Sequence, residues 1–146
     1  MATVIEKSEN ELVIHVSCVI VHGNDFLLLR RSPLDKKNPG KWDLPGGRVK
    51  FQEDPEKAMK REIMEETSLN IDNITPISIV NHNKHDKRRK QIVQIIYLAH
   101  LDHNTSIKLQ KKEHVDFIWI DKKDFEDVDC AFKDKIIQVL NKIFPN

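Results

Sequence analysis

The chain has 146 residues, which is a usual length for one domain, and we predict a single domain over residues 1–146. Hydrophobic residues make up 39% and charged residues 32%, too apolar a composition for disorder. The 24 Lys and Arg nearly balance the 23 Asp and Glu, which argues against a binder of polymeric nucleic acid. With neither a signal peptide nor an apolar run of the ~20 residues that span a membrane, a cytoplasmic protein without membrane contact is expected.

The first predicted elements form a β-hairpin. Residues 12–22 are rich in β-branched side chains and stop at the turn signal Gly23-Asn24-Asp25, after which a second strand is expected over 26–30. A polar stretch follows over 32–41. At 42–47 a Pro and two Gly are expected to break any regular element and to turn the chain sharply.

A helix is predicted next, because Asp54 is a capping residue and Pro55 suits the first helical position. It should run for about 14 residues, to near Ser68. Alternating or apolar runs then predict three strands, at Ile74 to Asn81, Gln91 to Leu101 and Val115 to Ile120. Helical spacing of apolar residues over Phe132 to Phe144 predicts a closing amphipathic helix, so the fold is an α/β sheet covered by helices.

The first helix carries a cluster of acids. At 100° per residue, Glu62, Glu65 and Glu66 fall within about one third of its circumference and repel one another. An isolated acidic triplet is more often a solvated face, but carboxylates gathered in this way also suit Mg²⁺, which combines a few of them with waters and substrate phosphates.

Softer metal ligands show no matching pattern. The seven His are scattered without the spacing of a zinc site, and Cys18 and Cys130 lie far apart among apolar neighbours. We therefore expect two buried thiols and no native zinc site.

One 23-residue segment contains Gly47, Glu53, Arg61, Glu62, Ile63, Glu65, Glu66 and Leu69. The spacing of these residues resembles the Nudix box, which reads G, five residues, E, seven residues, R-E-U-x-E-E-x-G-U, where U is apolar. Ser68 replaces the second Gly of the pattern, so the helix is expected to end differently there. The resemblance implies a Nudix-type α/β/α sandwich with a mixed β-sheet and a catalytic loop-helix-loop.

The resemblance also implies a role for each matching residue. Glu62, Glu65 and Glu66 would hold Mg²⁺, with Mn²⁺ as an alternative, and the carbonyl of Gly46 would be a further ligand. Among the catalytic residues, Glu62 is the first choice of general base beside Glu66, and Glu53 and Arg61 would support the helix through an ion pair.

A second candidate for the base, or for a further metal ligand, is Glu113, because MutT-type members carry an acid just ahead of the last strand; a surface Glu is an equally good interpretation. The basic run from Lys84 to Lys90 is interpreted as a solvated hairpin tip outside the site. Trp42 and Trp119 are expected in the core.

Phosphate binding is assigned to one of the two arginines that end the hairpin. Neighbouring strand residues face opposite sides, so at most one of Arg30 and Arg31 should face the substrate, and Arg30 is chosen.

The leading hypothesis is a MutT-like enzyme that converts a nucleoside or deoxynucleoside triphosphate to a monophosphate and pyrophosphate. Alternatives are a Nudix hydrolase of coenzyme A, ADP-ribose, a nucleotide sugar or a dinucleoside polyphosphate, or a non-catalytic nucleotide-binding Nudix module. The intact box acids disfavour the non-catalytic module. The expected partner is a small nucleotide, and a homodimer is left open.

Overall fold

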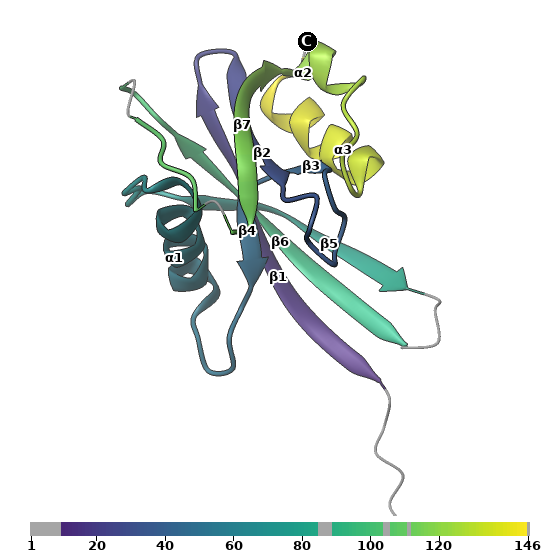
Figure 1. Cartoon of the computed structure of the whole chain (residues 1–146). Helices are drawn as coiled ribbons and strands as arrows, with labels where there is room; N and C mark the ends of the chain where they lie inside the picture. Colours follow the sequence, from purple (N-terminus) through teal and green to yellow (C-terminus); the bar gives the residue numbers. More distant parts are fainter. Residues whose placement is uncertain (1–9, 85–88, 104–105, 111, 146) are drawn as a thin grey trace, which may run out of the picture.

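The computed structural model describes residues 10–84, 89–103, 106–110 and 112–145 of the chain. The strands are β1 (Glu11–His22), β2 (Asp25–Arg31), β3 (Trp42–Asp43), β4 (Gly46–Arg48), β5 (Thr75–Lys84), β6 (Lys90–His100) and β7 (His114–Asp121). The helices are α1 (Pro55–Thr67), α2 (Lys122–Phe125) and α3 (Lys133–Ile143). Helix α1 covers one side of the sheet, and α2 and α3 cover the other (Figure 1). The predicted α/β/α arrangement is therefore confirmed.

Strand β1 is the centre of a mixed sheet. One of its edges pairs in parallel with β6, from Glu11 opposite Lys90 to Val21 opposite His100. Two strands share its other edge, because β4 pairs antiparallel with the middle of β1 and β2 pairs antiparallel with its end. Strand β5 lies outside β6, and β3 and β7 both pair with β2. The sheet therefore divides beside β1, between β4 and β2.

The core is split between the two faces of this sheet. On one face, Met59 and Ile63 of α1 pack against Cys18 and other buried residues of β1. On the opposite face, Phe26 of β2 packs with Phe125 of α2, and the two rings meet edge to face at 5.4 Å. Cys18 and Cys130 are both buried free thiols, and Trp42 and Trp119 are packed against the two clusters, as expected.

Helix α1 begins and ends with side-chain and backbone caps. The Asp54 carboxylate accepts a hydrogen bond from the Lys57 N–H at 3.1 Å, which satisfies one of the free donors of the first turn. At the other end Ser68 adopts a left-handed conformation, with φ of 63°, and its N–H donates to the Met64 carbonyl. The expectation that Ser68 would change the helix end was wrong, because this serine adopts the backbone that glycine favours, and its hydroxyl donates to the Lys108 carbonyl at 3.1 Å.

Strands β3 and β4 and the short helix α2 were not predicted. The prediction that 42–47 contains no regular element was wrong, because Gly46 and Gly47 pair with Ser17 and Val16 of β1. A Cβ atom on Gly46 would lie 2.1 Å from the Val16 carbonyl oxygen. The absence of a side chain therefore allows this close pairing.

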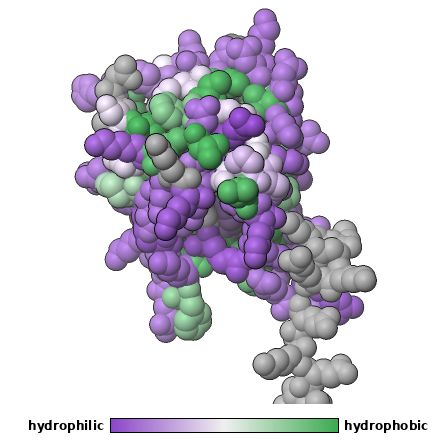
Figure 2. Space-filling view, viewed as in Figure 1, coloured by the Kyte–Doolittle hydropathy of each residue, from purple (hydrophilic) through white to green (hydrophobic). Residues whose placement is uncertain are grey.

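Most of the molecular face seen in Figure 2 is hydrophilic, and apolar side chains gather in a band across its upper part. Among the exposed large hydrophobic residues of the described chain are Val115, Phe117 and Ile118 of strand β7. Within the described residues, every helix is too short or too polar to cross a membrane.

Candidate active site

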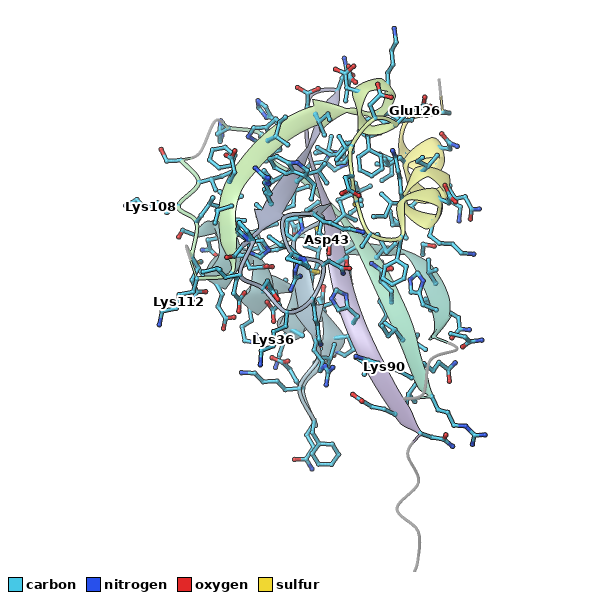
Figure 3. All side chains as sticks on the ribbon, turned by 45° about the vertical axis from the view of Figure 1, so that its right-hand side comes forward. Lys36, Asp43, Lys90, Lys108, Lys112 and Glu126 are labelled. Carbon is cyan, nitrogen blue, oxygen red and sulfur yellow. The ribbon has the colours of Figure 1, made fainter. Side chains whose placement is uncertain are left out.

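A cleft of about 620 Å³ opens where the sheet divides beside β1. It is lined by two acids from the C-terminal half of α1, by the glycines of β4, by the end of β2 with the loop that follows it, and by the start of β7. Its opposite side is formed by β5, β6 and Phe132. The lining residues Lys36, Asp43 and Lys90 are labelled in Figure 3. Residues from α1, from the sheet and from the start of α3 thus meet at this cleft.

Glu66 is the most deeply placed acid of the cleft, with a residue exposure of 2%. Its Oε1 atom accepts a hydrogen bond from the Gly46 N–H at 2.8 Å. Its Oε2 atom lies 3.3 Å from Nδ1 of His114. Burial, together with the neighbouring charge of Glu62, raises the pKa of the Glu66 carboxyl well above its ordinary value. One oxygen of Glu66 is therefore fixed by the backbone, and the other faces His114.

Glu62 lies one helical turn before Glu66 and reaches the cleft past a glycine. Its carboxylate occupies the space where Gly47 would carry a side chain, since a Cβ there would lie 2.4 Å from the Glu62 carboxyl carbon. Burial raises the pKa of Glu62, while an ion pair of 2.9 Å with Arg61 opposes that rise. Gly47 thus makes room for this acid beside Glu66.

Arg61 forms ion pairs with three acids of the Nudix box, namely Glu53, Glu62 and Glu65. It forms two hydrogen bonds with the carboxylate of Glu53, at 2.8 and 3.0 Å, and these bonds lower the Glu53 pKa to about 2. The predicted ion pair between these two residues is therefore formed. The Glu65 carboxylate also points to Arg61, at 3.2 Å, and half of that side chain is exposed. Glu65 is outside the residues that line the cleft.

Glu113 joins the cleft from the turn before β7, beside His114. One ligand atom from each of Glu66, Glu113 and His114 can be chosen so that all three lie within 4.8 Å of one another. Burial lowers the pKa of His114 to about 4, so the imidazole is neutral at pH 7 and its contact with Glu66 is not an ion pair. His114 was not predicted as a site residue, and its one signal in the sequence was its position next to Glu113.

Arg31, and not Arg30, lines the cleft. Arg30 is exposed, and its Nε donates to the Gly40 carbonyl at 3.2 Å. The Arg31 guanidinium lies 2.9 Å from Asp35, another lining residue. Strand alternation allowed only one of the two to face the cleft, and the structure places Arg31 there, whereas the sequence analysis chose Arg30. The pairing of β2 with β7 also shifts register between them.

A chain of polar side chains, also missed, forms the cleft wall on β1, β5 and β6. His82 contacts Gln94 at 2.8 Å, Gln94 donates to the Ser17 hydroxyl at 2.8 Å, and that hydroxyl lies 3.4 Å from His15 Nδ1. The ring of Phe132 packs on His82 with centroids 4.0 Å apart. Polar residues in otherwise apolar strands were the available signal. Of the basic run set aside earlier, Lys90 lines the cleft, whereas residues 85–88 lie outside the described residues.

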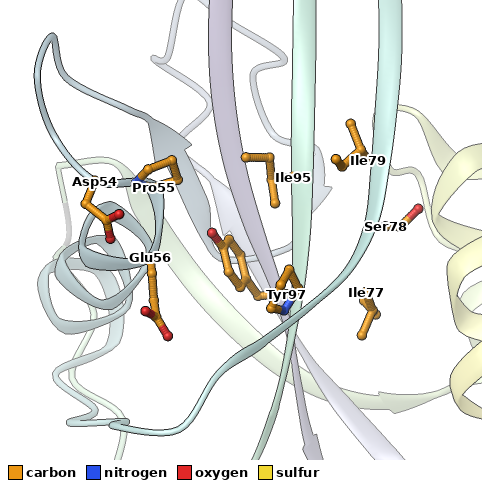
Figure 4. A pocket seen from close by; sticks show the side chains of 9 residues that line it. Asp54, Pro55, Glu56, Ile77, Ser78, Ile79, Ile95 and Tyr97 are labelled. Atoms are coloured by element: carbon orange, nitrogen blue, oxygen red, sulfur yellow. The ribbon is translucent and has the colours of Figure 1, made fainter.

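A second groove, of about 570 Å³, lies between the first turn of α1 and strands β5 and β6 (Figure 4). Its lining is mainly apolar, with Pro55, Ile79, Ile95 and Tyr97 among its residues. Of the described residues, the only group placed to hold a metal ion is the one around Glu66, in the other cleft. The chemistry-bearing side chains therefore point to the cleft beside β1.

Comparison with known proteins agrees with this fold. Residues 11–140 match the family model described as the NUDIX domain, so the chain belongs to the NUDIX family. The class of protein that this fold defines is the Nudix hydrolase, as the sequence predicted.

Individual relatives are similar over different lengths. An 8-oxo-dGTP diphosphatase of Proteus vulgaris is 32% identical over 73 residues, which cover 48% of this chain and 63% of that protein. The MutT protein of Methanosarcina mazei Go1 superposes with a TM-score of 0.77 at 27% identity, covering 96% of this chain and all of the other. A MutT NUDIX hydrolase of Burkholderia pseudomallei gives a TM-score of 0.69 at 26% identity, covering 78% and 86% of the two chains.

Proposed function

We propose that this protein is a Mg²⁺-dependent pyrophosphohydrolase that converts a nucleoside or deoxynucleoside triphosphate to a monophosphate and pyrophosphate. One observation carries the proposal: the buried carboxylate of Glu66 shares a cleft with Glu62 and Glu113, and cationic side chains line the same cleft. Acids beside cations are what a site needs if it must hold both a divalent ion and phosphates. The similarity to MutT proteins and to an 8-oxo-dGTP diphosphatase supports the same reaction class.

The residues of the cleft fit a divalent cation. Two acids with raised pKa values, Glu62 and Glu66, are held close together, and a bound cation would relieve the repulsion between them. The buried Nδ1 of His114 has no hydrogen-bond partner among the described residues, which also indicates a missing ligand. Glu62, Glu66, Glu113 and the carbonyl of Gly46 would hold Mg²⁺, or Mn²⁺ in its place. Glu65 would have to leave Arg61 to contribute.

Each residue near the acids has a part in the proposed chemistry. A divalent cation bound here supplies charge neutralisation for the diphosphate and makes the attacking water more acidic. Glu62 accepts the proton of that water as the general base, and Arg61 holds its carboxylate in place at 2.9 Å. Arg31 and Lys36, both on the cleft, bind phosphate oxygens. Glu53 acts through Arg61 and is a positioning residue.

The nucleoside would occupy the opposite side of the cleft, on β5 and β6. Phe132 is 40% exposed there and presents an aromatic ring on which a base can stack. His82 and Gln94 lie beside it and carry groups that can hydrogen-bond the edge of a base. This wall therefore supports a substrate with a nucleobase.

The test is an assay for phosphate and pyrophosphate release across nucleoside triphosphates, including 8-oxo-dGTP, and across coenzyme A, ADP-ribose and dinucleoside polyphosphates. We expect turnover that requires Mg²⁺ or Mn²⁺ and is highest on a triphosphate, with pyrophosphate and a monophosphate as the products. Highest turnover on one of the other compounds would move the substrate to that class. Nucleotide binding without turnover of any compound would replace the enzyme by a binding module.

A further inference from the structure

We propose that His114 is a nitrogen ligand of the metal site, so that this protein has a mixed nitrogen and oxygen site that prefers Mn²⁺ to Mg²⁺. The inference rests on the proposed function, because it places the imidazole at the same cation. Nδ1 of His114 lies 3.3 Å from Oε2 of Glu66, and one ligand atom from each of Glu66, Glu113 and His114 lies within 4.8 Å of the other two. An imidazole beside two carboxylates is a different donor set from oxygen ligands alone.

The imidazole of His114 is buried and has an unsatisfied nitrogen atom. His114 is 3% exposed, and its Nδ1 atom is buried without a hydrogen-bond partner among the described residues. Leaving such an atom unpaired costs about 1–3 kcal/mol, so buried polar atoms of this kind generally have a partner. Nδ1 lies 3.3 Å from Oε2 of Glu66, without the geometry of a hydrogen bond. A cation held between the two atoms would satisfy both.

The spacing of the donor atoms also fits a metal ion. Two neighbouring ligands of an octahedral ion with bonds of about 2.1–2.3 Å lie about 3.0–3.2 Å apart, and two opposite ligands lie about 4.2–4.6 Å apart. The Nδ1 to Oε2 distance is 3.3 Å, and one ligand atom can be chosen from each of Glu66, Glu113 and His114 so that all three lie within 4.8 Å of one another. A shift of a few tenths of an ångström would therefore bring them to coordination distances.

Backbone contacts hold the residues that carry the donors. The Gly46 N–H fixes Oε1 of Glu66 at 2.8 Å, which leaves Oε2 for the ion. The backbone N–H groups of Glu113 and His114 both donate to the Gln110 carbonyl at 3.2 Å, and the Glu113 carbonyl accepts from Ser32 at 2.8 Å. The turn that presents Glu113 and His114 is thus tied to the loop after β2. Such ties hold ligands in place before an ion binds.

The preference for Mn²⁺ follows from ligand chemistry. Mg²⁺ binds oxygen ligands and keeps much of its water, whereas imidazole nitrogen suits transition metals. A nitrogen donor therefore adds to the affinity for Mn²⁺ and little to that for Mg²⁺. Loss of His114 should weaken Mn²⁺ binding by about tenfold or more and change Mg²⁺ binding by less than about threefold.

The experiment uses the full chain loaded with one equivalent of Mn²⁺ and studied by pulsed electron paramagnetic resonance. We expect a ¹⁴N coupling from a bound imidazole, and we expect it to be replaced by a ¹⁵N coupling when the histidines are ¹⁵N-labelled. His114→Asn should abolish the coupling. His15→Gln and His82→Gln, which change the other two cleft histidines, should keep it. Calorimetric titration with Mn²⁺ and Mg²⁺ gives the ratio of the two affinities in each variant.

The outcomes separate this inference from the proposed function. Bound Mn²⁺ without nitrogen coupling, in a protein that still hydrolyses nucleotides, would overturn the inference alone, and so would coupling that persists in a folded His114→Asn. Failure to bind either ion would overturn both proposals. If His114→Asn does not fold, the labelled wild type shows whether an imidazole binds, and the double variant of His15 and His82 shows whether it is His114.

Discussion

A Cβ atom on Gly47 would lie 2.4 Å from the carboxyl carbon of Glu62, whereas the nearest atom to a Cβ on Gly46 is a backbone oxygen, that of Val16, at 2.1 Å. The lack of a side chain therefore has a different structural role at each of the two adjacent glycines. Gly47 leaves room for the movable end of an acidic side chain, and Gly46 leaves room for a neighbouring strand.

This difference gives the first prediction. Gly47→Ala should fold, because the Glu62 side chain can swing away, but it should lower kcat by about 100-fold through displacement of the general base. Gly46→Ala should lower stability, because backbone atoms cannot move aside as easily. Thermal unfolding and turnover measured on both variants check this. Wild-type turnover by a folded Gly47→Ala would contradict the role given to Glu62.

The second prediction compares two neighbouring acids of α1. Glu66→Gln should lower metal-dependent turnover by about 100-fold or more with little loss of stability, because the amide keeps an oxygen for the Gly46 N–H while a buried negative charge is removed. Glu65→Gln is the matched control. It should have a much smaller effect, since that carboxylate is half exposed and paired with Arg61 outside the cleft. Equal losses in the two variants would instead make Glu65 a metal ligand.

The third prediction concerns the cleft wall. Phe132→Ala should raise KM for the best triphosphate by about tenfold and leave kcat within about threefold, because stacking on one base contributes about 1–3 kcal/mol. Phe51→Ala removes a ring that is 93% exposed and not part of the cleft lining, so it serves as the control. Steady-state kinetics decide the matter, and an unchanged KM in Phe132→Ala would place the base elsewhere.

The fourth prediction concerns the end of α1. Ser68→Gly should keep the free energy of unfolding within about 1 kcal/mol, because relief of the left-handed conformation offsets the lost hydroxyl contact with Lys108. Ser68→Val should destabilise the protein by about 1–2 kcal/mol, since a β-branched residue is strained at this φ. Urea unfolding measures both values. A Ser68→Val variant as stable as the wild type would show that the helix end rearranges easily.

The fifth prediction is a pH dependence. Burial lowers the pKa of His15 to about 4, below its ordinary value of 6.5, so the unfolded chain binds this proton more readily than the folded one. The contribution of His15 to stability is therefore lost as pH falls from about 6.5 to about 4. His15→Gln carries no proton to bind, so its melting temperature should fall less than that of the wild type between pH 7 and pH 5. Parallel melting curves for the two proteins would contradict this assignment.

Local patterns in the sequence were enough to predict the acid cluster of α1. Glu62 and Glu66 lie four residues apart on one helix, so their proximity follows from helical geometry alone. The caps at Asp54 and Ser68 set both ends of that helix, and each is a short-range feature. The Glu53 and Arg61 pair also falls within one local segment.

The other side of the site depends on contacts between distant residues. Gln94 meets Ser17 only because β6 lies against β1, and His114 meets Glu66 only because β7 begins beside the cleft. The choice between Arg30 and Arg31 depended on the orientation of β2 in the sheet. A single sequence shows strand alternation but not which face is the cleft, so these residues could not be assigned in advance.

The parallel pairing of β1 with β6 also bears on how the chain folds. Strand β1 ends at His22, and its partner strand begins at Lys90, so the central ladder joins segments that are far apart in the sequence. Closing so large a loop costs entropy before the ladder returns any free energy, which slows folding relative to local hairpins. During synthesis, the edge of β1 that pairs with β6 has no partner until β6 has left the ribosome. Shortened chains that end before β6 should therefore aggregate.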